Sequence, residues 1–144
     1  MDTACLPADE QGIIIAAGIL ASGGLVAFPT ETVYGLGANA LDAGAVAAIY
    51  AAKGRPGDNP LIAHVTCIEQ ARDYGEWNSL AQTLAEAFWP GPLTLIVGRK
   101  PPVPAMTSAG LPTLALRAPD HPTARALIAR CGFPLAAPSA NRSG

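Results

Sequence analysis

The sequence predicts an α/β domain built on a mixed, twisted sheet. Apolar segments of strand length alternate along the chain with segments whose apolar residues have helical spacing. Half of the residues are hydrophobic and only 14% are charged, a composition typical of a chain that buries a large core. The 15 glycines and 14 prolines supply the tight connections that such a fold needs. At 144 residues we expect one domain.

The N-terminal elements follow from a capping residue and a pair of glycines. Asp9 is a residue type that caps helices, and apolar residues with helical spacing follow it to about Ala21. Gly23 and Gly24 are expected to end this helix, and residues 25–28 are predicted to form a short strand. The stretch 12–28 carries no charge, but it lacks a basic flank and is short for a membrane span. We therefore expect a buried helix that leads into a buried strand.

The remaining elements alternate in the same way. Residues 29–39, rich in Thr and Gly, are predicted to be a loop, and Asp42 is expected to cap a helix over 43–52 that delivers Lys53 at its end. The later predicted strands are 61–65, 93–97, 113–117 and 135–137, and the later predicted helices are 69–74, 80–88 and 123–130.

Charge and cysteine content narrow the functional classes. The net charge of -2 gives no general attraction to nucleic acid or to an anionic membrane, so any contact with RNA requires a local basic patch. Cys5, Cys67 and Cys131 lie far apart and without zinc-binding spacing. Free thiols of this kind are typical of the reducing cytoplasm, where we expect this protein to act, with no membrane contact.

Polar residues gather at or just beyond the ends of the predicted strands, where open α/β sheets bind ligands. No Lys or Arg precedes Lys53, and Arg55 follows two residues later, so this pair is expected to bind an anion, phosphate being the commonest. The clusters are Thr30-Glu31-Thr32 with Tyr34, Lys53 and Arg55 with Asn59, Arg117, and Ser139 with Asn141.

Each cluster also has an ordinary structural interpretation. The hydroxyls of Thr30 and Thr32 commonly bond nearby backbone, and a histidine inside a strand, such as His64, is more often a core residue than a ligand contact. The buried guanidinium of Arg117 requires a carboxylate, either Asp120 or a bound acid. Lys53 and Arg55 are equally typical of a solvated helix end, and Ser139 and Asn141 of a turn.

Five segments, taken in order, resemble the YrdC/TsaC family of threonylcarbamoyl-adenylate synthases: 24–37, 53–56, 59–61, 89–94 and 138–144. The resemblance implies a YrdC-like α/β fold, a twisted and mostly open mixed sheet flanked by helices around a large concave cavity. It also implies that L-threonine, bicarbonate or CO2, and ATP are joined to threonylcarbamoyl-AMP with release of pyrophosphate.

The same resemblance assigns roles to individual residues. Lys53, Arg55, Ser139 and Asn141 match the family's catalytic positions and would also bind ATP, together with Asn59 and Thr113. Threonine would be bound by Thr30, Thr32, Tyr34, His64 and Arg117. A metal site made by the protein is not expected, and Mg2+ would enter with the phosphates of ATP.

The family also implies partners and two rival functions. The product would pass to a tRNA threonylcarbamoyl transferase complex, and contact with tRNA or double-stranded RNA is an expectation. Family members continue past the Ser-x-Asn motif, so we expect residues 1–144 to be one YrdC-like domain truncated at its C-terminus. The rivals are an RNA-binding protein without synthase activity and a ligand-binding inactive fragment. A carbamoyl-transfer domain of the hydrogenase-maturation type would use carbamoyl phosphate instead of threonine.

Overall fold

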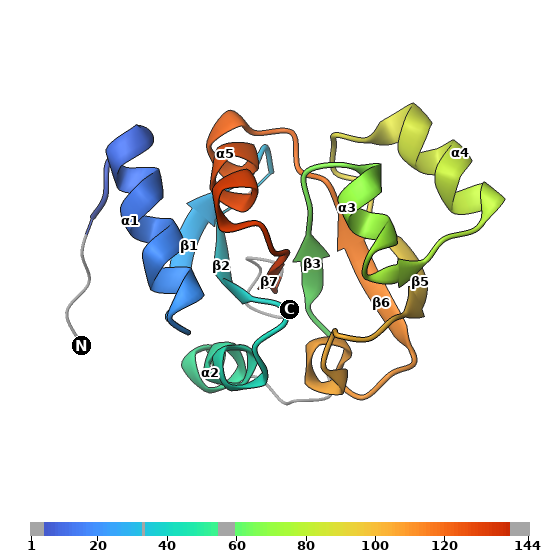
Figure 1. Cartoon of the computed structure of the whole chain (residues 1–144), viewed down its shortest axis with the longest axis horizontal. Helices are drawn as coiled ribbons and strands as arrows, with labels where there is room; N and C mark the ends of the chain where they lie inside the picture. Colours follow the sequence, from blue (N-terminus) through green and yellow to red (C-terminus); the bar gives the residue numbers. More distant parts are fainter. Residues whose placement is uncertain (1–4, 33, 55–59, 139–144) are drawn as a thin grey trace.

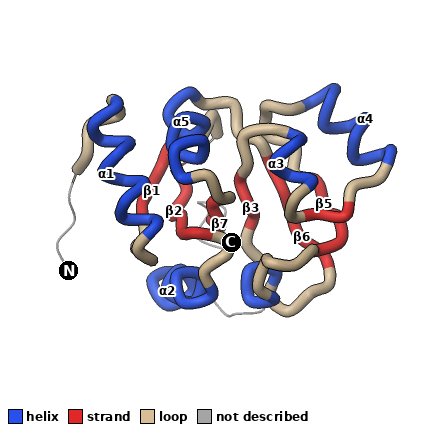
Figure 2. Tube along the Cα trace, viewed as in Figure 1, coloured by secondary structure: helices blue, strands red, loops and turns tan. Residues whose placement is uncertain are grey.

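A twisted sheet with helices on both faces forms the domain (Figures 1 and 2). The computed structural model describes residues 5–32, 34–54 and 60–138. Within these ranges seven strands form one sheet in the order β1-β2-β7-β3-β6-β5-β4. β3 and β6 are parallel, and the other neighbouring strands are antiparallel. The sheet is therefore mixed, and the predicted α/β fold class is confirmed.

The strands are β1 (Val26–Pro29), β2 (Tyr34–Asn39), β3 (Ile62–His64), β4 (Gly75–Glu76), β5 (Leu95–Arg99), β6 (Thr113–Arg117) and β7 (Leu135–Ala137). The α-helices are α1 (Glu10–Ala21), α2 (Ala43–Lys53), α3 (Ile68–Arg72), α4 (Ser79–Phe88) and α5 (Pro122–Cys131), and η1 (Ala105–Ser108) is a 3-10 helix.

The predicted caps start two helices as expected. The carboxylate of Asp9 accepts a hydrogen bond from the backbone N–H of Gly12 at 2.9 Å, and that of Asp42 accepts one from Ala45 at 3.2 Å. Both bonds satisfy backbone donors that have no partner inside the helix. Every predicted helix is present, with bounds that shift by at most a few residues.

The prediction of a loop over residues 29–39 is wrong, because its second half is the strand β2. β2 forms a hairpin with β1 in which Val26 pairs with Gly37 and Pro29 with Tyr34. Gly35 and Gly37, which are typical of turns, instead make room for an aromatic ring. A Cβ atom on Gly37 would lie 2.6 Å from the ring of Phe28, which is fully buried.

β4 and η1 are also absent from the prediction. β4 has only two residues, too few for an alternating pattern. η1 buries Thr107, whose hydroxyl donates to the carbonyl of Ala40 at 2.8 Å, while its carbonyl accepts from the N–H of Leu61 at 3.2 Å. The helix therefore joins the segment before β3 to the connection between β2 and α2.

Three apolar clusters show which face each helix covers. Ala136 of β7 packs with α2, whereas its neighbours Leu135 and Ala137 pack with α1 and α5, so these helices lie on opposite faces. Ala63 of β3 pairs with Ala136 and belongs to the cluster that contains residues of α3 and α4. One face is therefore covered by α2, α3 and α4, and the other by α1 and α5.

The face that carries α1 and α5 is open over β3, β6 and β5 in the part of the chain that the structure describes. Ile62, Ala115 and Ile96 are neighbours across these strands and point away from the α3–α4 cluster. Ile96 is 70% exposed, and Ile62 and Ala115 are half-buried. We refer to this surface, completed by Thr113 and Arg117 on β6, as the open face.

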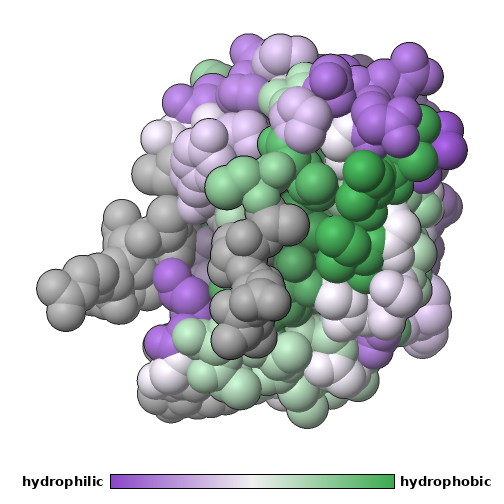
Figure 3. Space-filling model, turned by 90° about the vertical axis from the view of Figure 1, so that its left-hand side faces the viewer, coloured by the Kyte–Doolittle hydropathy of each residue, from purple (hydrophilic) through white to green (hydrophobic). Residues whose placement is uncertain are grey.

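α1 is less buried than predicted. Its Ala16, Ala17 and Leu20 enter the core, but Ile14, Ile15 and Ile19 are exposed. Figure 3 shows hydrophobic residues gathered on the side of the molecule where α1 lies. An apolar sequence all round a helix does not by itself bury every side, because only one side of α1 packs on α5 and the hairpin. None of the helices in the described ranges has the length and hydrophobicity required to cross a bilayer.

We expect Thr107→Val to lower the free energy of unfolding by about 1–3 kcal/mol, because the buried Ala40 carbonyl would lose its donor while the side-chain volume stays similar. Urea denaturation followed by circular dichroism measures this change. Thr83→Val is the matched control, since that hydroxyl donates to Ser79 on the exposed surface of α4. Equal effects of the two substitutions would contradict a structural role for the Thr107 bond.

Candidate functional site

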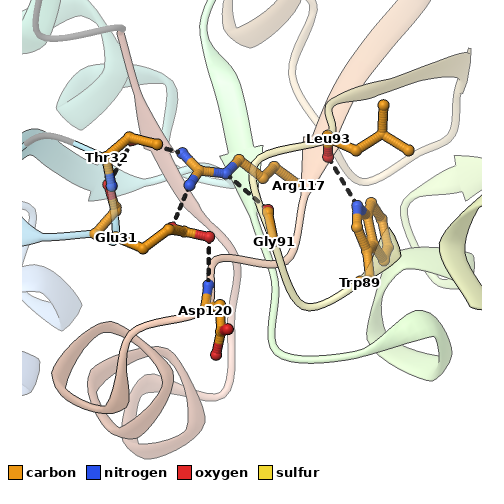
Figure 4. Close-up of polar contacts among 8 residues, drawn as sticks. Glu31, Thr32, Trp89, Gly91, Leu93, Arg117 and Asp120 are labelled. Carbon is orange, nitrogen blue, oxygen red and sulfur yellow. Dashed lines mark hydrogen bonds and ion pairs between the residues drawn. The ribbon is translucent and has the colours of Figure 1, made fainter. Parts of the chain in front are cut away.

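Arg117, at the end of β6, is the centre of the candidate site (Figure 4). Its side chain is buried, and the residue is only 7% exposed. Its Nε donates to the carbonyl of Gly91 at 3.1 Å, and its terminal nitrogens contact the hydroxyl of Thr32 at 3.5 Å and the carboxylate of Glu31. The prediction that this guanidinium requires a carboxylate is confirmed, but that carboxylate belongs to Glu31.

The proposed pairing of Arg117 with the side chain of Asp120 is wrong. Asp120 contributes its backbone N–H, which donates to the second carboxylate oxygen of Glu31 at 2.9 Å. Glu31 therefore joins the β1–β2 turn to β6 and to the segment that leads into α5 (Figure 4). Sequence proximity favoured Asp120, whereas a partner 86 positions away is brought in only by the folded hairpin.

The loop that follows α4 is shaped to present the Gly91 carbonyl. The indole N–H of Trp89 donates to the Leu93 carbonyl, and the N–H of Gly91 donates to the Ala118 carbonyl, both at 2.8 Å. A Cβ atom on Gly91 would lie 2.6 Å from the carbonyl oxygen of Phe88, so a larger residue does not fit without movement. The sequence segment 89–94 thus supports Arg117, a function that its motif alone did not indicate.

The turn between β1 and β2 brings Thr30 and Thr32 together. Their hydroxyls lie 3.0 Å apart, and the N–H of Thr32 donates to the Thr30 hydroxyl at 3.3 Å. The expected bonding to nearby backbone is confirmed for the Thr30 hydroxyl, whereas the Thr32 hydroxyl contacts Thr30 and Arg117. Tyr34, which pairs with Pro29 at the start of β2, is 67% exposed.

His64 is a core histidine next to Arg117 on the parallel strand β3. It is 4% exposed, its ring meets Phe28 edge to face, and its Nδ1 lies 3.1 Å and 3.2 Å from the carbonyls of Ile62 and Leu135. Because both partners are acceptors, Nδ1 carries the proton and Nε2 holds the lone pair. Burial lowers the pKa of His64 from 6.5 to about 4, so the ring is neutral at physiological pH.

Of the residues predicted to bind ATP, only Lys53 and Thr113 lie within the described ranges. Lys53 is the exposed last residue of α2, which ends at Gly54 in a left-handed conformation. Thr113 begins β6 on the same face as Arg117, four residues away, which corresponds to roughly 13 Å along a strand. Arg55, Asn59, Ser139 and Asn141 lie outside the described residues.

A separate hollow lies at the far edge of the sheet. Its volume is about 470 Å³, and Arg72, Gly75, Trp77 and Lys100 are among the residues that line it. None of the predicted site residues lines this hollow, so we assign the candidate site to Arg117 and the open face instead. Among the described side chains, no three of His, Cys, Asp or Glu gather closely enough to hold a metal ion.

Comparison with known proteins places this arrangement in a family. The Sua5/YciO/YrdC family model, described as telomere recombination, matches residues 18–144. The chain is 55% identical over 142 residues to the threonylcarbamoyl-AMP synthase of Bacillus subtilis, a match that covers 96% of this chain and 41% of that protein. It is 54% identical over 137 residues to the protein of the same name from Pyrococcus abyssi, with 94% and 40% covered.

A solved structure extends the similarity to three dimensions. The crystal structure of P. abyssi Sua5 complexed with L-threonine matches with a TM-score of 0.90 at 53% identity, covering 93% of this chain and 40% of that one. The chain therefore belongs to the Sua5/YciO/YrdC family, and the predicted resemblance is confirmed. The chain spans about two fifths of the length of these relatives.

We expect acidification from pH 6.5 to pH 4 to destabilise the fold through His64. In the unfolded chain this ring takes up a proton near its ordinary pKa of 6.5, whereas in the folded protein the pKa of His64 is about 4. Stability from His64 is thus complete above pH 6.5 and lost as pH falls, in total roughly 3 kcal/mol. Urea denaturation at several pH values measures it.

Substitution of each of the two histidines tests this assignment. In His64→Gln the dependence of the free energy of unfolding on pH between 6.5 and 4 should become shallower than in the parent protein. His121→Asn controls for the loss of a histidine as such: at pH 7 its free energy of unfolding should stay close to that of the parent, because His121 is half-buried and accepts from the Thr123 N–H as a helix cap, which Asn can replace. An unchanged slope in His64→Gln would contradict the assignment.

Proposed function

We propose that this domain forms threonylcarbamoyl-AMP from L-threonine, bicarbonate or CO2, and ATP, and releases pyrophosphate. The observation that carries the proposal is the buried guanidinium of Arg117 beside Thr32, at one end of an open sheet face. Family membership and the two relatives named threonylcarbamoyl-AMP synthase support the same reaction.

Arg117 is suited to the carboxylate of an amino acid. A guanidinium has five N–H donors, and among the described residues Gly91, Thr32 and Glu31 engage three of them. The two that remain, one on each terminal nitrogen, match the two oxygens of a carboxylate. Thr30, Thr32 and Tyr34 would complete the threonine site, and neutral His64 would offer the lone pair of Nε2 to a donor group of the substrate. The P. abyssi relative was solved with L-threonine, which supports this choice of ligand.

The opposite end of the open face is proposed to bind ATP. Thr113 lies there, roughly 13 Å from Arg117 along β6. β7 also runs toward this end, because its last residue, Ala137, pairs with Ile62 at the start of β3. Ser139 and Asn141 come shortly after Ala137 in the sequence. Lys53, Arg55, Asn59, Ser139 and Asn141 would bind the nucleotide and its phosphates. Mg2+ would arrive with ATP as part of that substrate.

The reaction requires both substrates in one sheltered place. The threonine nitrogen attacks the carbon of CO2, loses a proton and becomes a carbamate. A carbamate oxygen then attacks the α-phosphorus of ATP, and the bond from that phosphorus to the bridging oxygen breaks to release pyrophosphate. Lys53 and Arg55 would neutralise the charge that develops on this leaving group. The intermediate is labile in water, so proximity and exclusion of water matter more than a covalent nucleophile.

The product defines the proposed biological setting. Threonylcarbamoyl-AMP is an activated acyl donor for adenosine in tRNA, and we propose that a tRNA threonylcarbamoyl transferase complex accepts it in the cytoplasm. The exposed Cys5 and Cys67 are free thiols, as expected in a reducing compartment. The net charge of -2 gives no general attraction to tRNA, so contact between this domain and tRNA would require a local basic patch.

Pyrophosphate release from ATP, with and without L-threonine, tests the reaction in buffer that contains bicarbonate and Mg2+. We expect release that depends on threonine, and threonylcarbamoyl-AMP detectable by mass spectrometry. Carbamoyl phosphate in place of threonine and bicarbonate should support no release. Pyrophosphate release at the same rate with and without threonine would contradict the proposed reaction.

We expect Lys53→Ala to lower the threonine-dependent rate about a hundredfold, since a cation would be lost from the developing pyrophosphate charge. The only other lysine, Lys100, supplies the control, because it donates to the Arg72 carbonyl at the far edge of the sheet. Lys100→Ala should keep the parent rate. A parent-like rate in Lys53→Ala would remove Lys53 from the ATP site and leave it as a solvated helix end.

A further inference from the structure

Glu31 lies at the centre of the hydrogen bonds around Arg117, yet the proposed reaction gives it no task. Both of its carboxylate oxygens are engaged, one by Arg117 and the other by the N–H of Asp120 at 2.9 Å. A carboxylate held from two sides by an arginine and a backbone donor has a fixed position. Glu31 is therefore placed to orient its neighbours rather than to bind a ligand itself.

The orientation of the Arg117 guanidinium follows from three contacts. Gly91 accepts from Nε, Glu31 from one terminal nitrogen and Thr32 from the other. Because the guanidinium is planar, three contacts around its rim determine both its plane and its rotation. Glu31 supplies the charged one, and in the described residues no other carboxylate forms an ion pair with Arg117.

Glu31 also helps to hold the turn that carries Thr32. The turn between β1 and β2 reaches Arg117 at Glu31 and Thr32, and the Glu31–Asp120 bond ties the same turn to the segment before α5. Figure 4 shows Glu31 between Arg117 and Asp120. Loss of the carboxylate would remove the charged contact of the guanidinium and the bond that ties the turn to the segment before α5.

We propose that Glu31 is a positioning residue for the carboxylate of the amino-acid substrate. It acts through Arg117, whose two remaining N–H donors it aligns, and through the turn that carries Thr32. The inference rests on the proposed function, because it takes Arg117 to be the group that binds this carboxylate. It adds a residue that sets the preference for a free amino acid over an analogue without the negative charge.

The test compares L-threonine with L-threoninamide, which lacks the negative charge. Calorimetry gives the affinity of each compound for the parent chain, for Glu31→Gln and for Asp120→Asn. In Glu31→Gln the preference for threonine should fall about tenfold or more, since the amide cannot accept from both Arg117 and Asp120. Asp120→Asn makes the same change of carboxylate to amide nearby but keeps the backbone N–H, so its preference should equal that of the parent.

The pyrophosphate assay adds a second readout. Glu31→Gln should raise the KM for threonine while the KM for ATP stays within about twofold, a difference that general destabilisation would not produce. Circular dichroism establishes that each variant is folded. Should Glu31→Gln fail to fold, Glu31→Asp tests the same preference, because its shorter side chain cannot reach both partners.

Two results would overturn the inference, and they differ. A folded Glu31→Gln or Glu31→Asp that keeps the parent's preference for threonine would make Glu31 a structural residue and leave the proposed function intact. A parent chain that neither binds threonine nor depends on it for pyrophosphate release would reject the proposed function and, with it, the role of Glu31.

Discussion

Burial of the Arg117 cation at the end of β6 is the constraint on which the arrangement of this domain depends. A buried guanidinium is tolerated only when its charge is paired and hydrogen-bonded, and here its three partners come from two segments that lie far from Arg117 in the sequence. The β1–β2 turn supplies Glu31 and Thr32, and the loop after α4 supplies Gly91. Removal of one partner would leave a charge in the interior, so these loops are held in place together.

The same burial fixes the direction in which Arg117 presents its charge. The chain has a net charge of -2, so a general attraction to anions does not arise from its overall charge. Arg117 instead offers two donors in a fixed direction, next to a neutral His64 whose pKa is about 4 because of its burial. The open face of β3, β6 and β5 separates this end from Thr113 by roughly 13 Å along β6.

Much of the fold follows from local signals in the sequence. The features that the sequence did not predict have a common cause, which is packing between distant segments. Asp9 and Asp42 cap helices, and 113–117 and 135–137 are strands, because each element carries its own periodicity or cap. The sequence predicts a loop in place of β2 because Gly35 and Gly37 are typical of turns. In the structure these two glycines leave space for the Phe28 ring. Likewise, the sequence of α1 is apolar on every side of the helix. Three of its isoleucines are exposed because other elements pack against only one side of α1.

The sequence by itself determined the fold class and the family, and it predicted Arg117 and Thr32 as site residues, because motifs and capping residues are local. Tertiary structure alone decided that Glu31 neutralises Arg117, that Asp120 contributes a backbone N–H, and that segment 89–94 supports the guanidinium. These are contacts between distant segments, and nothing in a local pattern specifies which carboxylate reaches a buried cation. The folded hairpin makes that choice by bringing Glu31, rather than the nearer Asp120 side chain, to the end of β6.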